Sequence, residues 1–207
     1  MVCNVVLVVA PAVDYGIGSP YAVVRSTLDL DSEHSLPAWY ASIQWFIASA
    51  LFGSFVILLR RGWRSAMTAL ALVCLAFSAD EIVGFHEWLG QRTDALLPGG
   101  DRANTVLWRT GIWPLIIGVP VVLLLGGMLV QVRRMYAPAP RAFRLLVLGF
   151  ALMFGGALLV ELGANLVVDP DDNQGRALLQ LICEELLEML GVTLIIWSAY
   201  ALLVAYG

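Results

Sequence analysis

Long apolar stretches alternate along the chain with short polar connections. Five of them are long enough for a helix to cross the bilayer, which takes roughly 20 residues; they span residues 39–59, 65–90, 107–132, 142–168 and 177–206. Residues 1–13 form a further apolar segment that is short and lacks the basic start of a signal peptide. The pattern predicts an all-α fold: a polytopic transmembrane helical bundle with five spans and a candidate sixth at the N-terminus.

Composition supports this interpretation and excludes several classes of protein. Of the 207 residues, 60% are hydrophobic and 14% are charged, whereas soluble domains carry about 25% charged residues. Residues 1–207 contain no internal repeat or low-complexity tract, which predicts a single integral membrane domain in contact with the lipid bilayer. The net charge of −4 does not suit a nucleic-acid binder. Because the chain has no lysine, chemistry through a Schiff-base lysine is excluded.

Arginine placement predicts the orientation. The connections at 60–64 and 133–144 contain arginine and no acid, whereas those at 14–38, 91–106 and 169–176 hold nearly all the loop acids. Basic connections remain on the cytoplasmic side of a membrane. We therefore expect a protein of the inner (cytoplasmic) membrane with its C-terminus in the cytoplasm.

Acidic residues interrupt three of the predicted spans. A carboxylate in the middle of a membrane costs about 2.5–3.5 kcal/mol on insertion scales. At about 1.5 Å per residue, Asp80, Glu161, Glu184 and Glu188 all fall in the outer half of the bilayer. On regular helices each span has one polar face, so we expect these acids to meet inside the bundle. Glu81, Glu87 and Glu185 lie close by in sequence and are also compatible with the outer rim.

Three arrangements would make such a cluster tolerable: protonation of some acids, a bound cation, or an outward water-filled cavity reached by Arg25, Arg92, Arg109 or Arg176. We expect a divalent metal, and carboxylates with a single imidazole favour manganese, iron or zinc. The candidate ligands are Asp80, His86, Glu87, Glu161, Glu184 and Glu188. In a regular helix His86 would lie about 120° from the face of Asp80 and Glu87, so it would need another neighbour or a loosened helix near Gly84.

The connection before the 39–59 span reads "LDLDSEHSLP". Its acids are typical of a solvated loop. The alternative is a lid over the outer mouth of the bundle that adds Glu33 or His34 to the cluster.

Three motifs together resemble an uncharacterised family of bacterial multi-pass membrane proteins. They are "LDLDSEHSLPAWYAS", "FSADEIVGFHE" and "EELLEMLG", within residues 28–45, 76–90 and 184–191. The family patterns read roughly LPxWYS, SxDE…HE and EExxEMxG; this chain departs from the first, because Ala41 separates Tyr40 from Ser42. The resemblance implies a membrane protein but no known activity. Ceramidase-like zinc sites and membrane di-iron desaturases require more histidines than the two in this chain.

The sequence leaves three functions open and identifies no catalytic residue. The first is a metal-dependent membrane enzyme that acts on a lipid or a quinone-like substrate. The second is a non-catalytic subunit or sensor of a larger membrane complex, with other membrane proteins as partners. The third is a cation or proton translocator, which the apolar inner halves of the spans disfavour because a relay needs acids through the membrane thickness.

Overall fold

The computed structural model describes residues 1–58, 61–100, 102–103, 105–167 and 174–206. The regular secondary structure of these residues is helical throughout. The α-helices are α1 Val2–Gly16, α2 Ala22–Thr27, α3 Leu36–Leu58, α4 Arg61–Val83, α5 Phe85–Thr93, α6 Val119–Val132, α7 Pro140–Phe154, α8 Glu161–Val167 and α9 Gln174–Tyr206. Two 3₁₀ turns follow α5 (η1 Asp94–Leu96 and η2 Pro98–Gly100), and two π-helical segments, η3 Pro114–Gly118 and η4 Gly155–Val160, precede α6 and α8.

Five helical stretches are long and apolar enough to cross a membrane, which confirms the predicted all-α polytopic bundle. They are Leu36–Ile57, Arg64–Val83, Pro114–Val132, Pro140–Val167 and Gly175–Tyr206. The helix α1 is also apolar but is shorter than these five.

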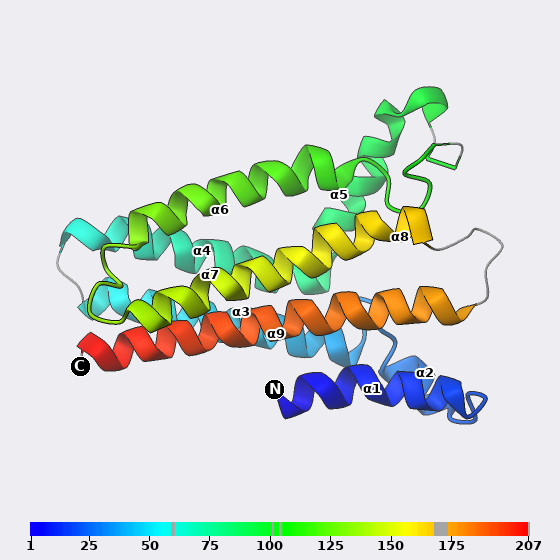
Figure 1. Cartoon of the computed structure of the whole chain (residues 1–207), viewed down its shortest axis with the longest axis horizontal. Helices are drawn as coiled ribbons and strands as arrows, with labels where there is room; N and C mark the ends of the chain where they lie inside the picture. Colours follow the sequence, from blue (N-terminus) through cyan, green and yellow to red (C-terminus); the bar gives the residue numbers. More distant parts are fainter. Residues whose placement is uncertain (59–60, 101, 104, 168–173, 207) are drawn as a thin grey trace.

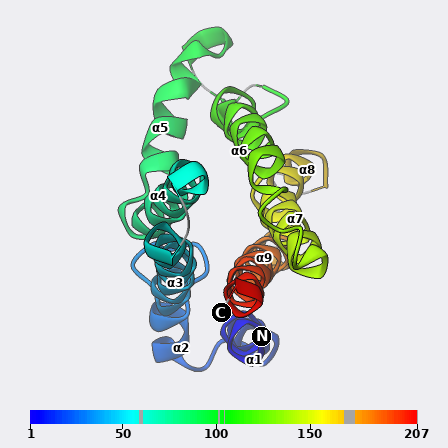
Figure 2. The same cartoon turned by 90° about the vertical axis from the view of Figure 1, so that its left-hand side faces the viewer.

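The helices form two rows, and the long helix α9 of one row also contacts α3 of the other. Figure 2 shows α3, α4 and α5 in one row and α6, α7 and α9 in the other, with α1 beside α9. In Figure 1 the C-terminus and the start of α7 lie at one end of the bundle, and α2, α5 and the end of α8 lie at the other. We call this second end the cavity end.

The core is apolar and continuous between α3, α4, α7 and α9. Trp45, Phe52, Met67, Leu146 and Ile195 belong to one buried cluster. Two helices approach closely within it, because a Cβ atom added to Gly149 of α7 would lie 2.7 Å from the Gly191 carbonyl oxygen of α9. Small residues permit such contacts between membrane helices. This packing fixes α9, and therefore its acids, against the α7 row.

The continuous helix expected over 65–90 is interrupted. The helix α4 ends at Val83, Gly84 has φ +63°, and a new helix α5 begins at Phe85. A left-handed residue cannot continue a right-handed helix, and glycine adopts this conformation at little cost. The interruption changes the direction of His86 and Glu87 relative to Asp80. It corrects the single span over 65–90 and agrees with the alternative of a loosened helix near Gly84.

The third span is also shorter than the expected 107–132. It begins at Pro114, which occupies the first turn of η3 rather than a kink inside a helix. Proline is tolerated there because the first backbone N–H groups of a helix have no partner within it. Gly111, with φ +72°, precedes this start. Residues 107–113 therefore connect to the helix at the cavity end.

A π-helical segment also interrupts the fourth span just before Glu161. The segment η4 covers Gly155–Val160, and a Cβ atom at Gly156 would lie 2.7 Å from the Glu184 carbonyl oxygen. Single π turns shift the face of the residues that follow them and often occur at functional sites. This one brings Glu161 and the two α9 acids, Glu184 and Glu188, to the same level of the bundle.

Candidate functional site

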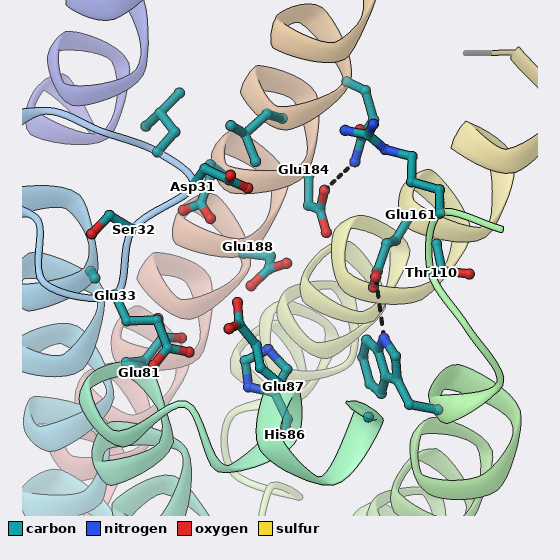
Figure 3. A pocket seen from close by; sticks show the side chains of 18 of the residues that line it. Asp31, Ser32, Glu33, Glu81, His86, Glu87, Thr110, Glu161, Glu184 and Glu188 are labelled. Carbon is teal, nitrogen blue, oxygen red and sulfur yellow. Dashed lines mark hydrogen bonds between the residues drawn. The ribbon is translucent and has the colours of Figure 1, made fainter. Parts of the chain in front are cut away.

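A polar cavity of about 470 Å³ lies at the cavity end. Acids from the loop before α3, from α4, α5, α8 and α9 line it; they are Asp31, Glu33, Glu81, Glu87, Glu161, Glu184, Glu185 and Glu188. Figure 3 shows several of these carboxylates directed toward a common space from opposite walls. Asp31, Glu87 and Gln91 of this lining are exposed, so the cavity is accessible from the surface.

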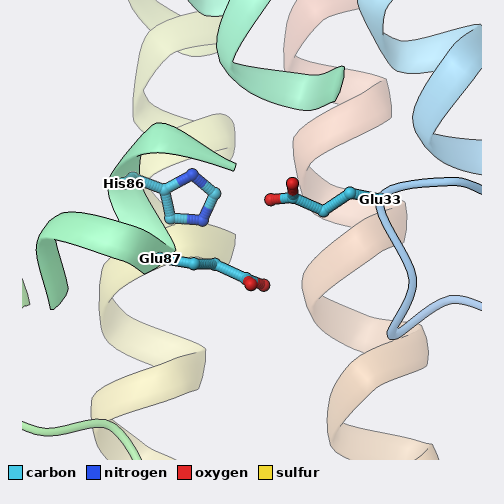
Figure 4. A group of neighbouring side chains, drawn as sticks. All are labelled: Glu33, His86 and Glu87. Atoms are coloured by element: carbon cyan, nitrogen blue, oxygen red, sulfur yellow. The ribbon is translucent and has the colours of Figure 1, made fainter. Parts of the chain in front are cut away.

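Three side chains of the cavity form a group with metal-ligand spacing. One donor atom each from Glu33, His86 and Glu87 lie within 4.8 Å of one another. In Figure 4 the imidazole and the two carboxylates point toward one another, with Glu33 coming from the loop and the other two from α5. Two carboxylate oxygens and one imidazole nitrogen suit zinc, manganese or iron.

Asp80 contacts the His86 imidazole through its Nδ1 atom. Its Oδ2 lies 2.8 Å from His86 Nδ1, and its Oδ1 accepts a hydrogen bond of 3.0 Å from the His86 backbone N–H. An Nδ1–H donated to a carboxylate leaves Nε2 as the nitrogen that binds a cation. Burial lowers the pKa of His86, but the hydrogen bond and charge of Asp80, with the charges of Glu87 and Glu33, raise it to about 9.

The loop before α3 contributes acids to the cavity, and one of them packs closely against Gly84. The Glu33 carboxylate lies where a side chain at Gly84 would be, so only glycine leaves room for it. Burial and the charge of Glu87 raise the pKa of Glu33. Burial and the charge of Asp29 raise that of Asp31. A neighbouring cation would relieve the repulsion among these carboxylates.

The opposite wall carries a hydrogen-bonded chain. Arg109 Nε donates to Gln180 Oε1 at 3.1 Å, and Gln180 Nε2 donates to Glu184 Oε2 at 2.5 Å. Trp113 Nε1 donates to Glu161 Oε1 at 3.2 Å, and its ring centroid lies 5.6 Å from that of His86. These contacts orient Glu161 and Glu184 toward the cavity.

The predicted ligands take three kinds of position. His86 and Glu87 belong to the three-donor group, and Glu161, Glu184 and Glu188 line the polar cavity outside that group. Asp80 is bonded to His86 and lines the adjoining apolar cavity instead. Glu33 joins the group as the lid alternative anticipated, and Arg109 reaches the cavity as one of the four arginines considered.

Several residues of the site were not predicted. Trp113 and Arg102 line the polar cavity, as do Glu81 and Glu185, which were considered compatible with the rim. Gln180 also lines this cavity, as expected from its position four residues before Glu184 on the same face of a regular helix. Trp113 reaches the cavity because of the turn that precedes η3, and no pattern in the sequence indicates this position.

A second cavity of about 540 Å³ adjoins the first and is mainly apolar. Its walls come from α4, η3, α6, α7 and η4, with Phe77, Val121 and Phe154 among them. Both cavities share Glu81, His86, Trp113, Glu161, Glu184 and Glu188. The acids therefore lie where a polar and an apolar compartment meet.

Comparisons with known proteins add a family and no activity. No curated protein and no solved structure matches the chain. Residues 1–204 match the family described as "Domain of unknown function (DUF8692)", and the chain belongs to that family.

Proposed function

We propose that the protein is a metal-dependent membrane enzyme with its metal bound by Glu33, His86 and Glu87. The observation that carries this proposal is the convergence of three donors from two separate segments within 4.8 Å. The Asp80–His86 contact of 2.8 Å supports it, because imidazole ligands are commonly oriented by a carboxylate on the other ring nitrogen. A bound divalent cation would supply Lewis-acid chemistry to a substrate in the cavity.

The chain's own residues have separable roles in this proposal. Asp80 orients the His86 ring, and the Gly84 break allows Glu33 to reach it. Glu161 and Glu184, on the opposite wall, are candidates for proton transfer to or from a substrate, because each is held by one neutral donor, Trp113 or Gln180. The substrate we propose is a lipid or a quinone-like molecule, because the acids adjoin an apolar cavity within the membrane spans.

We also propose that the cavity end faces the outer side of the inner membrane, with the C-terminus in the cytoplasm. The proposal is supported by the arginines of the 133–144 connection, which carries no acid and lies at the opposite end from the cavity.

The translocator alternative gains no support from the interior beyond Glu188. That half of the bundle is filled by buried apolar side chains, among them Phe52, Phe55, Leu70 and Leu202. Polar side chains described there, such as Gln44 and Ser198, are not acidic, and a relay would need acids through the membrane thickness.

The decisive experiment measures metal in purified protein. Zinc, manganese and iron are determined by elemental analysis after purification without chelators, and their affinities by titration of chelator-treated protein. We expect about one metal ion per chain and a loss of affinity of at least about ten-fold in Glu33→Gln, His86→Gln and Glu87→Gln.

Two controls identify the ligands. His34→Gln removes the other histidine, which is exposed, and should leave the affinity unchanged. Glu161→Gln and Glu184→Gln separate the two candidate ligand sets. If they abolish binding while Glu33→Gln does not, the metal lies at the acids of α8 and α9 instead. Protein that binds none of the three ions would contradict the proposal and favour the subunit or translocator alternatives.

A further inference from the structure

The apolar cavity has the position of a binding site for a membrane-borne chain. It lies between the two helix rows, bounded by α4 on one side and by α6 and the α7–η4 segment on the other (Figure 2). Its volume of about 540 Å³ is within the range of roughly 300–1,000 Å³ that ligand pockets occupy. Phe77, Met153 and Phe154 give it a hydrocarbon-like interior.

One wall of this cavity is also membrane-facing surface. Ala76, Ala79 and Val83 line the cavity from α4 and are exposed, Val83 by 70%. The first two are small, which leaves an opening beside α4. Because these residues belong to the span Arg64–Val83, this side of α4 would be in contact with lipid when the span crosses a membrane. A chain can therefore enter sideways from the bilayer.

The apolar cavity adjoins the acid cluster. His86, Glu161 and Glu188 line both cavities. A molecule with its chain among Phe77, Met153 and Phe154 would accordingly present its other end to the three-donor group. The two compartments thus match an amphipathic ligand.

The charge of the polar compartment restricts which head groups that ligand can have. Eight acids line it, against Arg102, Arg109 and His86. An anionic head would be repelled by those of the eight acids that are ionised, even beside one divalent cation. A permanently cationic head would compete with the metal for the same carboxylates. An uncharged head with oxygen atoms avoids both conflicts and can approach a metal.

We propose that the apolar cavity binds the chain of a single-chain lipid with an uncharged, oxygen-bearing head, which enters from the bilayer beside α4. The proposal rests on the proposed function for the role of the bound head, and deepens it by naming the substrate class. Long-chain alcohols, monoacylglycerols and prenylated quinones share this chemistry.

The experiment is photo-crosslinking of the full-length protein in phosphatidylcholine nanodiscs. The probe is hexadecanol with a diazirine in its chain, and labelled peptides are identified by mass spectrometry. We expect saturable labelling of the cavity residues Phe77, Met153 and Phe154. Leu123 of α6, which is 70% exposed, reports unsaturable labelling from bulk lipid.

Matched alanine substitutions test the location. Ala157 lines the cavity from η4, so Ala157→Phe should lower saturable labelling about ten-fold by filling the space. Ala151 is exposed on α7 and lines neither cavity, so Ala151→Phe should leave labelling unchanged. Labelling that is equal in all variants, or that never saturates, would overturn the proposal.

Competition tests the head and its source. Unlabelled hexadecanol should compete about ten-fold better than hexadecyl phosphate, because of the carboxylate excess. Monohexadecanoylglycerol and a prenylated benzoquinone then distinguish a glycerolipid from a quinone as the physiological ligand. Equal or better competition by hexadecyl phosphate or by hexadecylamine would overturn the uncharged head.

The outcome can be separated from that of the metal experiment. The crosslinking is done with chelator-treated and with metal-loaded protein, and chain binding is expected in both. Saturable labelling in a protein that binds no metal would leave the lipid site standing while the enzyme proposal failed. Metal binding without saturable labelling would leave the metal site standing while the lipid proposal failed.

Discussion

Asp80 controls both the direction and the protonation of the His86 ring. The two side chains are joined at 2.8 Å, and the Asp80 side chain is 24% exposed, so water screens the pair only in part. Burial by itself lowers the pKa of a histidine because it disfavours the charged form. The value of about 9 thus depends on the neighbouring carboxylates, with Asp80 the main one.

Asp80→Asn should accordingly lower the pKa of His86 by at least about one unit, toward the ordinary value near 6.5. The pKa is measured by nuclear magnetic resonance of protein with labelled histidine. The assignment is simple because the chain has two histidines, and His34→Gln removes the other signal. A pKa that stays near 9 in Asp80→Asn would show that Glu33 and Glu87 hold the proton instead.

The same pKa sets the pH dependence that is expected of the proposed metal site. Below about pH 9 the metal-free imidazole carries the proton that a cation must displace from Nε2. Affinity should therefore fall by about ten-fold for each pH unit below 9 through this proton, and more where Glu33 also titrates. Calorimetry in buffers of different ionisation enthalpy at pH 7.5 should show about one proton released per metal bound. Binding without proton release would exclude His86 as a ligand.

The sequence indicates that the cluster is acidic more readily than it indicates which residues belong to it. Acids inside apolar spans are conspicuous because burying them is costly, so Glu161, Glu184 and Glu188, which line the cavity, were candidates from the sequence. Glu33 lies in a polar loop, where acids need no explanation. Only the fold of that loop back toward α5 gives it a ligand's position, which is why the sequence offered it merely as part of a lid.

Gly84 is the element-scale feature on which the site depends. Its left-handed conformation ends α4, and its missing side chain leaves room for the Glu33 carboxylate. Sequence offered a loosened helix near Gly84 only as one of two alternatives, because an isolated glycine inside an apolar helical pattern is usually tolerated. The five spans themselves were predictable because length and hydropathy suffice for them.

Gly84→Ala should destabilise the protein by about 1–2 kcal/mol, since alanine is strained in this conformation, and should weaken metal binding by displacing Glu33. Stability is measured by thermal unfolding in detergent and affinity by metal titration. Gly53→Ala is the matched control, because a Cβ atom there meets nothing within 4 Å inside a helix. The control should unfold at the same or a higher temperature. Normal metal affinity in Gly84→Ala would mean that Glu33 is not a ligand.

In the whole molecule, an arginine-rich connection and the acid-lined cavity lie at opposite ends of the bundle. Arg133 and Arg134 follow α6, at the end that carries the C-terminus, whereas the acid-lined cavity is at the other end. Basic residues resist transfer across a membrane, so this asymmetry supports the orientation proposed above. A substrate head in the polar cavity would then be exchanged with the outer aqueous side, while its chain remained in the bilayer.

Cysteine accessibility tests this orientation in intact cells. The native Cys3, Cys74 and Cys183 are first replaced by serine, because two of them are exposed. His34→Cys, at an exposed position of the cavity end, should then react with a membrane-impermeant maleimide added from outside. Ala137→Cys, exposed in the arginine-rich connection, should react only after the membrane is permeabilised. The reverse pattern would place the cavity in the cytoplasm. The head of the lipid, and the cation that binds it, would then come from the cytoplasmic side, and the outward-facing enzyme proposed here would be wrong even if the metal and the chain bind as described.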